Sequence, residues 1–264
     1  MPQHIDIGNS KIAFFSRRSD GGWNQKRVQL PVSDESLRTV IQSLPNEENF
    51  SNYFSSDATN AVSIKKHPWM ICSVNPNVEA QLKSVMDPLS KIHTVSWKDP
   101  WSFRFEKGDP SQIGADRLVL MEGALERVGA PVIVVSAGTA TTVSVVGRDR
   151  VFLGGMIAPG LEALIQAASF PAQLFRVDLT PKVQEKALGL STEEALQSGI
   201  RNGYLGLVHR LITQTQRALN DQASVVITGG AAPILEPVIE SEWVCDPFVL
   251  AEGMEKLYGS LCSL

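Results

Sequence analysis

A short strand–glycine–strand pattern occurs twice in the chain, and it constrains the fold more than any other feature. The first copy, HIDIGNSKIAFF, starts at His4 and turns at Gly8, and the second, VVSAGTATTVSVV, turns at Gly138. In each copy an apolar run stops at a glycine and small polar residues, and a second apolar run follows. The two glycines lie about half of the 264-residue chain apart. The repeat therefore predicts an internal duplication with two equivalent α/β halves.

The remaining segments predict further strands and helices in both halves. The first half has strand patterns over 27–30 and 69–74 and helical patterns over 37–44 and 78–85. The second half has a largely apolar helix over 116–128, followed by continuous apolar strands over 131–135 and 225–227. We place the boundary near residue 113, so the expected domains are residues 1–113 and 114–264.

Composition and charge exclude several classes of protein. Hydrophobic residues make up 43% of the chain and charged residues 20%, which suits a folded core and not a disordered chain. The net charge of −4 argues against nucleic acid as the main partner. No apolar run approaches the roughly 18 residues that cross a membrane, and the N-terminus does not resemble a signal peptide, so we expect a cytoplasmic protein. Cys72, Cys245 and Cys262 are too scattered for a disulfide framework or a zinc site.

The glycine turns have two open interpretations. Each is either a plain hairpin or a nest of backbone N–H groups that binds phosphate oxygens. Near the first turn, Asp6 could hold a hydrated magnesium ion and Lys11 could offset phosphate charge. Two such turns half a chain apart, with a third Gly-Gly after the strand at 225–227, favour the phosphate interpretation. The chain has neither the P-loop pattern nor GxGxxG, so the common phosphate-binding loops are excluded.

Six short motifs in a fixed order resemble those of type III pantothenate kinases. They are DIGNSKIA from Asp6, GADR from Gly114, SAGTATT from Ser136, GGMIAPG from Gly154, STEEALQSG from Ser191 and TGG from Thr228. Each motif alone is weak, but the ordered set covers nearly the whole chain. The resemblance implies an α/β fold of two ribonuclease-H-like halves, as in the acetate and sugar kinase/actin superfamily. Each half would be a mixed sheet with helices, and ATP would bind in the cleft between the halves.

The resemblance also implies an activity, which is transfer of the γ-phosphoryl group of ATP to the primary hydroxyl of pantothenate. This transfer is the first step of coenzyme A biosynthesis, and it needs positioning, charge neutralisation and a base near the hydroxyl. Asp116 of GADR matches the proton acceptor of the family. From the local pattern alone, Asp116 could equally be the N-cap of the helix that follows it.

The matching motifs assign the other site residues. The ATP-binding positions are Asp6, Ile7, Gly8, Asn9, Ser10, Lys11, Ile12 and Ala13 of the first turn, and Thr139 of the second. The substrate-contact positions are Gly114, Ala115, Asp116, Arg117 and Thr192. Asp6 is expected to hold Mg²⁺ through water. Ser191 and Glu194 also fit a capping box, so the Thr192 region could simply start a helix. Gly229 and Gly230 either pass close to the nucleoside or form an ordinary turn.

The chain departs from the family pattern at two positions. Ser136 occupies the place of an aspartate that binds a monovalent cation such as K⁺ or NH₄⁺, which puts cation activation in doubt. Lys107 replaces a tyrosine that touches pantothenate. An ammonium group at position 107 could pair with the substrate carboxylate or replace the charge of the missing cation.

Three functions remain open from the sequence. The first is an ATP-dependent pantothenate kinase, and the second is a related kinase that phosphorylates another small hydroxylated molecule. The third is a catalytically weakened relative that binds nucleotide and acts as a regulatory or accessory protein. For the kinase, the resemblance implies a homodimer whose partners are pantothenate and nucleotide, with no nucleic acid and no membrane.

Overall fold

The computed structural model describes residues 2–44, 69–86, 90–169, 187–220 and 223–263. The chain divides into two compact units, and each is described by itself. The first unit comprises Met1–Trp101, Asp109–Gly123 and Leu250–Leu264. The second comprises Ser102–Gly108 and Ala124–Val249.

The first unit is built on a mixed five-stranded sheet with the order β3-β2-β1-β4-β5. The first three strands form an antiparallel meander, and β4 and β5 then add in parallel to β1. Its elements are β1 (Gln3–Ile7), β2 (Lys11–Arg17), β3 (Trp23–Gln29), α1 (Asp34–Gln42), β4 (Trp69–Ser73), α2 (Pro76–Val85), β5 (Ile92–Thr94) and the 3₁₀ helix η3 (Pro110–Gln112).

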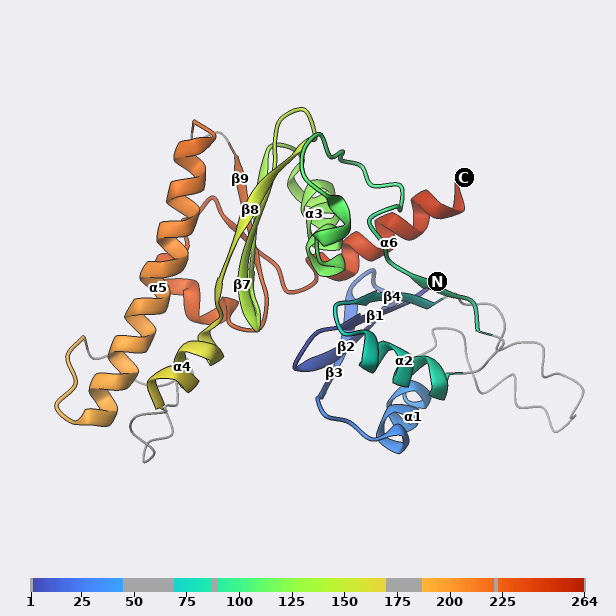
Figure 1. The fold of residues 1–264 in the computed structure, drawn as a ribbon, viewed down its shortest axis with the longest axis horizontal. Coiled ribbons are helices and arrows are strands. Elements are labelled where there is room, and N and C mark those ends of the chain that lie inside the picture. Colours follow the sequence, from blue (N-terminus) through green and yellow to red (C-terminus); the bar gives the residue numbers. More distant parts are fainter. Residues whose placement is uncertain (1, 45–68, 87–89, 170–186, 221–222, 264) are drawn as a thin grey trace, which may run out of the picture. The chain divides into compact units, whose positions relative to one another are not determined.

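Helices α1 and α2 cover one face of this sheet (Figure 1). Alternating residues of the central strands point into the core beneath them, among them Ile5, Ile7 and Phe14. Side-chain caps fix where the helices start, because Ser33 accepts the N–H of Ser36 at α1. The opposite face of the sheet carries the other alternating set of side chains, and that set contains Asp6.

The second unit repeats this plan with the sheet order β10-β9-β6-β7-β8. Here too an antiparallel meander, β6-β7-β8, is extended in parallel by β9 and β10. The same strand order and directions in both sheets confirm the internal duplication. Its elements are β6 (Val132–Ala137), β7 (Ala140–Val146), β8 (Phe152–Pro159), α4 (Leu161–Ser169), α5 (Thr192–Ala218), β9 (Ser224–Thr228), the 3₁₀ helix η4 (Ala232–Val238) and β10 (Val244–Cys245).

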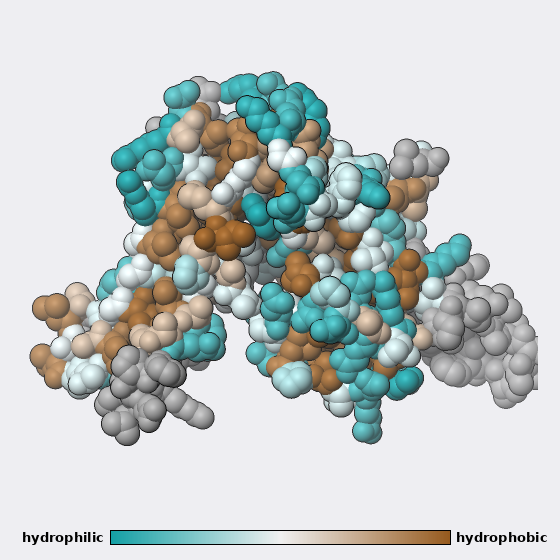
Figure 2. Space-filling view, in the orientation of Figure 1, coloured by the Kyte–Doolittle hydropathy of each residue, from teal (hydrophilic) through white to brown (hydrophobic). Residues whose placement is uncertain are grey.

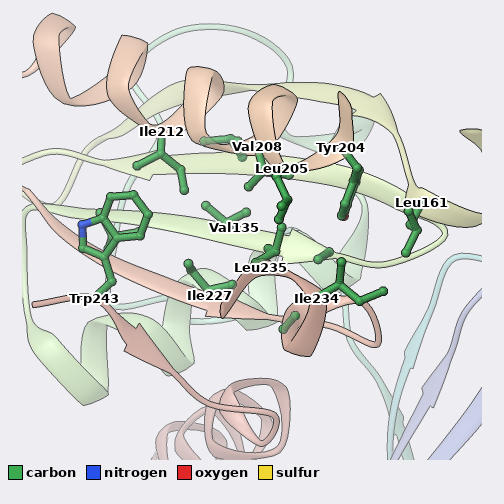
Figure 3. Packing of buried hydrophobic residues seen from close by; sticks show 14 of the residues in the cluster. Val135, Leu161, Tyr204, Leu205, Val208, Ile212, Ile227, Ile234, Leu235 and Trp243 are labelled. Carbon is green, nitrogen blue, oxygen red and sulfur yellow. The ribbon is translucent and has the colours of Figure 1, made fainter. Parts of the chain in front are cut away.

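The long helix α5 packs along one face of the second sheet (Figure 3). Tyr204, Val208 and Ile212 recur at helical spacing and are fully buried against the sheet. Burying an apolar side chain of this size stabilises the fold by about 1.5–3 kcal/mol. The hydroxyl of Tyr204 lies 3.0 Å from that of Thr141 on β7, so the buried polar atoms of both residues have a partner.

Two helices make the units differ from the domains expected at 1–113 and 114–264. The first part of α3 (Ala115–Val128) and nearly all of α6 (Val249–Cys262) belong to the first unit. Gly253 of α6 lies so close to Val119 of α3 that a Cβ there would overlap its carbonyl oxygen. Nε2 of the buried His4 on β1 is 2.8 Å from the Glu255 carboxylate, which ties α6 to the first sheet. The chain end therefore returns to the unit in which the chain began.

Two further sequence expectations, on the cysteines and on membrane-spanning segments, can be compared with the described residues. Cys72, Cys245 and Cys262 are free thiols. No helix in these ranges is long and apolar enough to cross a membrane. The segment 96–113 contains η3 and an isolated bridge between Arg104 and Val151.

Candidate active site in the first unit

The first glycine turn joins β1 to β2 and follows Asp6 directly. The N–H of Gly8 donates to the carbonyl of Lys11 at 3.0 Å, and the carbonyl of Ser10 accepts from Leu30 at 2.9 Å. A Cβ added at Gly8 would make only an ordinary contact at 3.4 Å, and Gly8 is not among the glycines with positive φ. The fold itself therefore does not require a glycine at position 8, and the absent side chain leaves the backbone of the turn accessible to a ligand.

Strand pairing brings four side chains to the face of the sheet opposite α1 and α2. Asp6 pairs with Ala13 on one side and with Cys72 on the other, and Ala13 pairs with Arg27. Paired residues point to the same face of a sheet, so these residues form one row across four strands. Lys11 lies on the same face of β2, because it is two residues from Ala13. We name this set the Asp6 row: Arg27, Ala13, Asp6 and Cys72.

Asp116 stands in the first turn of α3 and interacts electrostatically with Asp6. The expected alternative, that Asp116 is the N-cap, is wrong, because α3 already begins at Ala115. The carbonyl of Gly114 accepts the first N–H groups, those of Arg117 and Leu118. Asp116 instead accepts the N–H of Arg117 with Oδ1 at 2.9 Å. A Cβ at Gly114 would overlap this Oδ1, so the glycine permits the observed position of the carboxylate.

Two carboxyl groups with little access to water make this face electrostatically unusual. Burial raises the pKa of Asp6 from 3.8 to about 7, and repulsion from Asp116 adds to this effect. Attraction to Lys11 and Arg27 acts in the opposite direction and lowers the pKa of Asp6. Burial also raises the pKa of Asp116, against the N–H and charge of Arg117. Burial is thus the main reason why both carboxylates resist ionisation, and a cation bound close to them would favour their ionised forms.

Oxygen ligands of this kind suit Mg²⁺, which is commonly held by one or two carboxylates together with water and substrate phosphates. Within the described ranges, no group of three or more His, Cys, Asp or Glu side chains could hold a metal by itself.

A cavity of about 320 Å³ lies beside the first turn, at Asn9. It is lined by amide and aliphatic side chains and by no charged one; the lining residues include Val32, Asn75, Val78 and Gln81. Asn75 uses its Oδ1 to cap α2 at the N–H of Val78, and Gln81 donates to the carbonyl of Val32 at 2.9 Å. The lining suits an uncharged ligand part that carries hydrogen-bonding groups.

The second glycine turn, in the second unit, joins β6 to β7. The N–H of Gly138 donates to the carbonyl of Ala140 at 3.2 Å, and Thr139 is exposed. Close packing shapes the backbone around it, since a Cβ at Gly160 would overlap the carbonyl oxygens of Gly138 and Thr139. Gly229 has φ +103° and packs against Ala137, so the fold itself requires this glycine. The sequence left two interpretations of Gly229 open, contact with the nucleoside or an ordinary turn, and this close packing agrees with the ordinary turn.

The three remaining predicted positions also belong to the second unit. Ser136 on β6 pairs with Thr142 on β7 and with Thr228 on β9, so three hydroxyl side chains lie in a row without a carboxylate. Lys107 is exposed. Thr192 begins α5, and Ser191 is its N-cap, with Oγ accepting the N–H of Glu194 at 3.2 Å. The helix-start interpretation of this motif is therefore confirmed, while substrate contact by Thr192 stays a prediction.

Sequence analysis missed two members of the Asp6 row, Cys72 and Arg27. Burial raises the pKa of the Cys72 thiol well above its ordinary value, and the neighbouring Asp6 and Asp116 add to this. Both residues lie in predicted strands, and alternation along a strand tells which residues share a face of that strand. It places Cys72 and Arg27 beside Asp6 only when the register across the four strands is known.

Comparisons with known proteins agree with the arrangement of these motifs. The model of the type III pantothenate kinase family matches residues 4–214. A type III pantothenate kinase of Roseiflexus sp. (strain RS-1) is 36% identical over 265 residues, which covers 96% of both chains. That of Listeria monocytogenes serovar 1/2a is 38% identical over 263 residues and covers 96% of this chain and 95% of its own.

Two solved structures have a similar fold at low sequence identity. A Campylobacter jejuni protein named as a Baf family transcriptional activator has a TM-score of 0.59 at 19% identity, covering 99% of this chain and 100% of its own. A Sinorhizobium meliloti protein named as a 2-dehydro-3-deoxygalactonokinase has a TM-score of 0.56 at 12% identity, covering 100% and 98%. The α/β fold of two related mixed sheets is thus shared with these solved structures, and the chain belongs to the type III pantothenate kinase family.

Proposed function

We propose that this protein transfers the γ-phosphoryl group of ATP to the primary hydroxyl of pantothenate. The observation that carries the proposal is the placement of Asp116 near Asp6, on the face of the sheet that ends in an open glycine turn. Phosphoryl transfer needs a phosphate-binding backbone and an acidic group that holds the metal, with a second acidic group near the attacking hydroxyl. Membership of the kinase family supports pantothenate as the acceptor.

The first turn, from Asp6 to Ala13, binds the phosphates of ATP in this proposal. Backbone N–H groups of this turn and Lys11 face the phosphate oxygens, and Thr139 of the second turn also contacts the nucleotide. Asp6 would hold, through water, the Mg²⁺ that accompanies ATP, and this ion would neutralise phosphate charge. The repulsion between Asp6 and Asp116 supports this assignment, because a nearby cation favours the ionised form of both groups.

Asp116 acts as the base that accepts the proton of the hydroxyl while the bond to phosphorus forms. A carboxylate cannot deprotonate a free alcohol beforehand, but it can take the proton late in the transfer. Its raised pKa makes it a better proton acceptor than an exposed aspartate. Arg117 grips the substrate carboxylate, and the small Gly114 and Ala115 let the substrate approach the backbone. Thr192 and Lys107 contribute further substrate contacts from the second unit.

The cation requirement follows from Ser136. Hydroxyl oxygens bind K⁺ or NH₄⁺ more weakly than a carboxylate does, so the row of Ser136, Thr142 and Thr228 offers a weak site. We propose that turnover depends little on monovalent cations, with Lys107 replacing part of the missing charge.

A homodimer in the cytoplasm is the proposed assembly and location. Support comes from β8, an edge strand of the second sheet whose Leu153 and Ile157 are 55% and 67% exposed. The surface in view in Figure 2 mixes such hydrophobic patches with hydrophilic residues. Exposed apolar side chains on an edge strand favour pairing with another chain.

The deciding experiment follows ADP release by the purified protein with magnesium-ATP, with and without pantothenate and with K⁺ or Na⁺. The proposal expects release that depends on pantothenate and changes little with the cation. The departures at Ser136 and Lys107 are the observation that favours a weakened accessory relative, and nucleotide binding without turnover would support that function instead. ADP release that depends on another acceptor would indicate a kinase of different specificity.

A further inference from the structure

Arg27 on β3 is a cation on the face of Asp6 that neither the motifs nor the proposed roles use. Arg27 and Asp6 are separated in their row by Ala13 alone. Two strand spacings place their Cα atoms about 10 Å apart. Since Ala13 has a short side chain, an extended arginine passes over it and reaches the region of Asp6. The electrostatic attraction between Arg27 and Asp6 agrees with this reach.

The surroundings of Arg27 leave its guanidinium available to a ligand. The residue is exposed, and its guanidinium forms no hydrogen bond or ion pair with another residue in the described ranges. A purely structural arginine on a sheet surface normally pairs with a carboxylate or packs on an aromatic ring. Arg17 at the far end of the same meander does the latter, with its guanidinium 4.3 Å from the centre of the Trp23 ring.

The chemistry of the site explains why a second cation is needed. The triphosphate of ATP brings several negative charges to a face that already carries Asp6 and Asp116. Lys11, two residues nearer the turn on β2, supplies one positive charge on this face. An arginine offers a planar pair of N–H donors that binds two phosphate oxygens at once, which a lysine cannot do.

We propose that Arg27 binds a terminal phosphate of the nucleotide, from the side of the site opposite Cys72 and α3. This inference rests on the proposed function, since it assumes that the first turn binds a nucleotide. It adds a residue of β3 to a phosphate site otherwise assigned to the segment from Asp6 to Ala13.

The test compares Arg27→Gln and Arg27→Lys with the control Lys26→Gln. Lys26 is the neighbouring residue on β3 and points to the opposite face, where its Nζ donates to Ser43. Each glutamine variant therefore removes one positive charge from the same strand, but only one of them removes it from the Asp6 face. Calorimetry measures the Kd of a non-hydrolysable ATP analogue, ADP and adenosine, all in the presence of Mg²⁺.

We expect Arg27→Gln to weaken binding of the ATP analogue at least tenfold, to weaken ADP less and to leave adenosine unchanged. Arg27→Lys should lie between wild type and Arg27→Gln, and Lys26→Gln should stay within about twofold of wild type. The inference is overturned if Arg27→Gln and Lys26→Gln bind the analogue alike, or if adenosine binding falls as much as analogue binding. If the wild-type chain binds no nucleotide, the proposed function is overturned as well. If wild type binds the ATP analogue but Arg27→Gln binds it equally well, only the inference about Arg27 is overturned.

Discussion

Replacing Asp6 with asparagine should make the ligand-free protein more stable at neutral pH, although it removes a residue of the proposed site. The pKa of Asp6 is raised in the folded state, so the folded chain holds the proton more tightly than the unfolded chain does. The free energy of unfolding of the wild type therefore falls as the pH rises from about 3.8 to about 7. Above that range Asp6 is ionised in the folded chain, and the whole loss of stability is present. An asparagine at position 6 does not ionise and carries no such penalty.

The size of the effect follows from the same values. The difference between 3.8 and about 7 corresponds to about 4 kcal/mol at ~1.4 kcal/mol for each pKa unit. Because Asp6 as a whole residue is half-buried, solvent screens part of this energy, and we expect a gain of about 2 kcal/mol at pH 8. Functional sites often lower stability in this way.

Urea denaturation at pH 4, 6 and 8 measures the free energy of unfolding of both proteins. Asp6→Asn should match wild type at pH 4 and exceed it increasingly towards pH 8. Asp20→Asn is the matched control, since Asp20 is exposed and its pKa is lowered by its hydrogen bond with Arg18, so its loss should give no gain at pH 8. The reasoning fails if Asp6→Asn is less stable than wild type at pH 8, or if the difference does not change with pH.

Three further substitutions test other parts of the account. Asp116→Asn should abolish pantothenate-dependent ADP release without lowering the thermal midpoint at neutral pH, because burial raises the pKa of Asp116 as it does that of Asp6; appreciable turnover would exclude Asp116 as the base. Ser136→Asp should create a response of kcat to K⁺ over Na⁺, because it adds a carboxylate to a row of hydroxyls, and an unchanged response would contradict the weak cation site. Gly160→Ala should raise KM for ATP by displacing the turn at Thr139, which steady-state kinetics would show; an unchanged KM would separate that turn from nucleotide binding.

Local patterns predicted β1, β2, part of β3, β4, β6, β7 and β9 and the helices α1, α2 and α3, but they did not predict β8, β10, α4, α6 or most of α5. The glycine turns at Gly8 and Gly138 and their flanking strands lie where alternation predicted them. Ser33 and Ser191 cap helices, because a hydroxyl at the N-cap satisfies an otherwise free N–H. The short strand β5, Ile92–Thr94, was missed because three half-buried residues carry no periodic signal.

Contacts between distant segments were beyond sequence reasoning. His4 and Glu255 meet from opposite ends of the chain, and no local pattern shows that α6 returns to the first sheet. The position of Asp116 inside α3 depends on where the first helical hydrogen bond forms, and sequence fixes helix ends only to within a residue or two. The Asp6 row likewise needs the register of four strands, so Asp6 could be predicted from its motif but Arg27 could not.

The central claim is that this site transfers the γ-phosphoryl group to the hydroxyl oxygen of an alcohol and not to water. Phosphorus-31 NMR of a reaction containing the protein, magnesium-ATP and pantothenate tests this claim most directly. The account predicts ADP together with a new phosphomonoester signal that is split by the adjacent methylene protons of the phosphorylated primary alcohol. Inorganic phosphate as the sole new product, or an unchanged ATP spectrum, would contradict it.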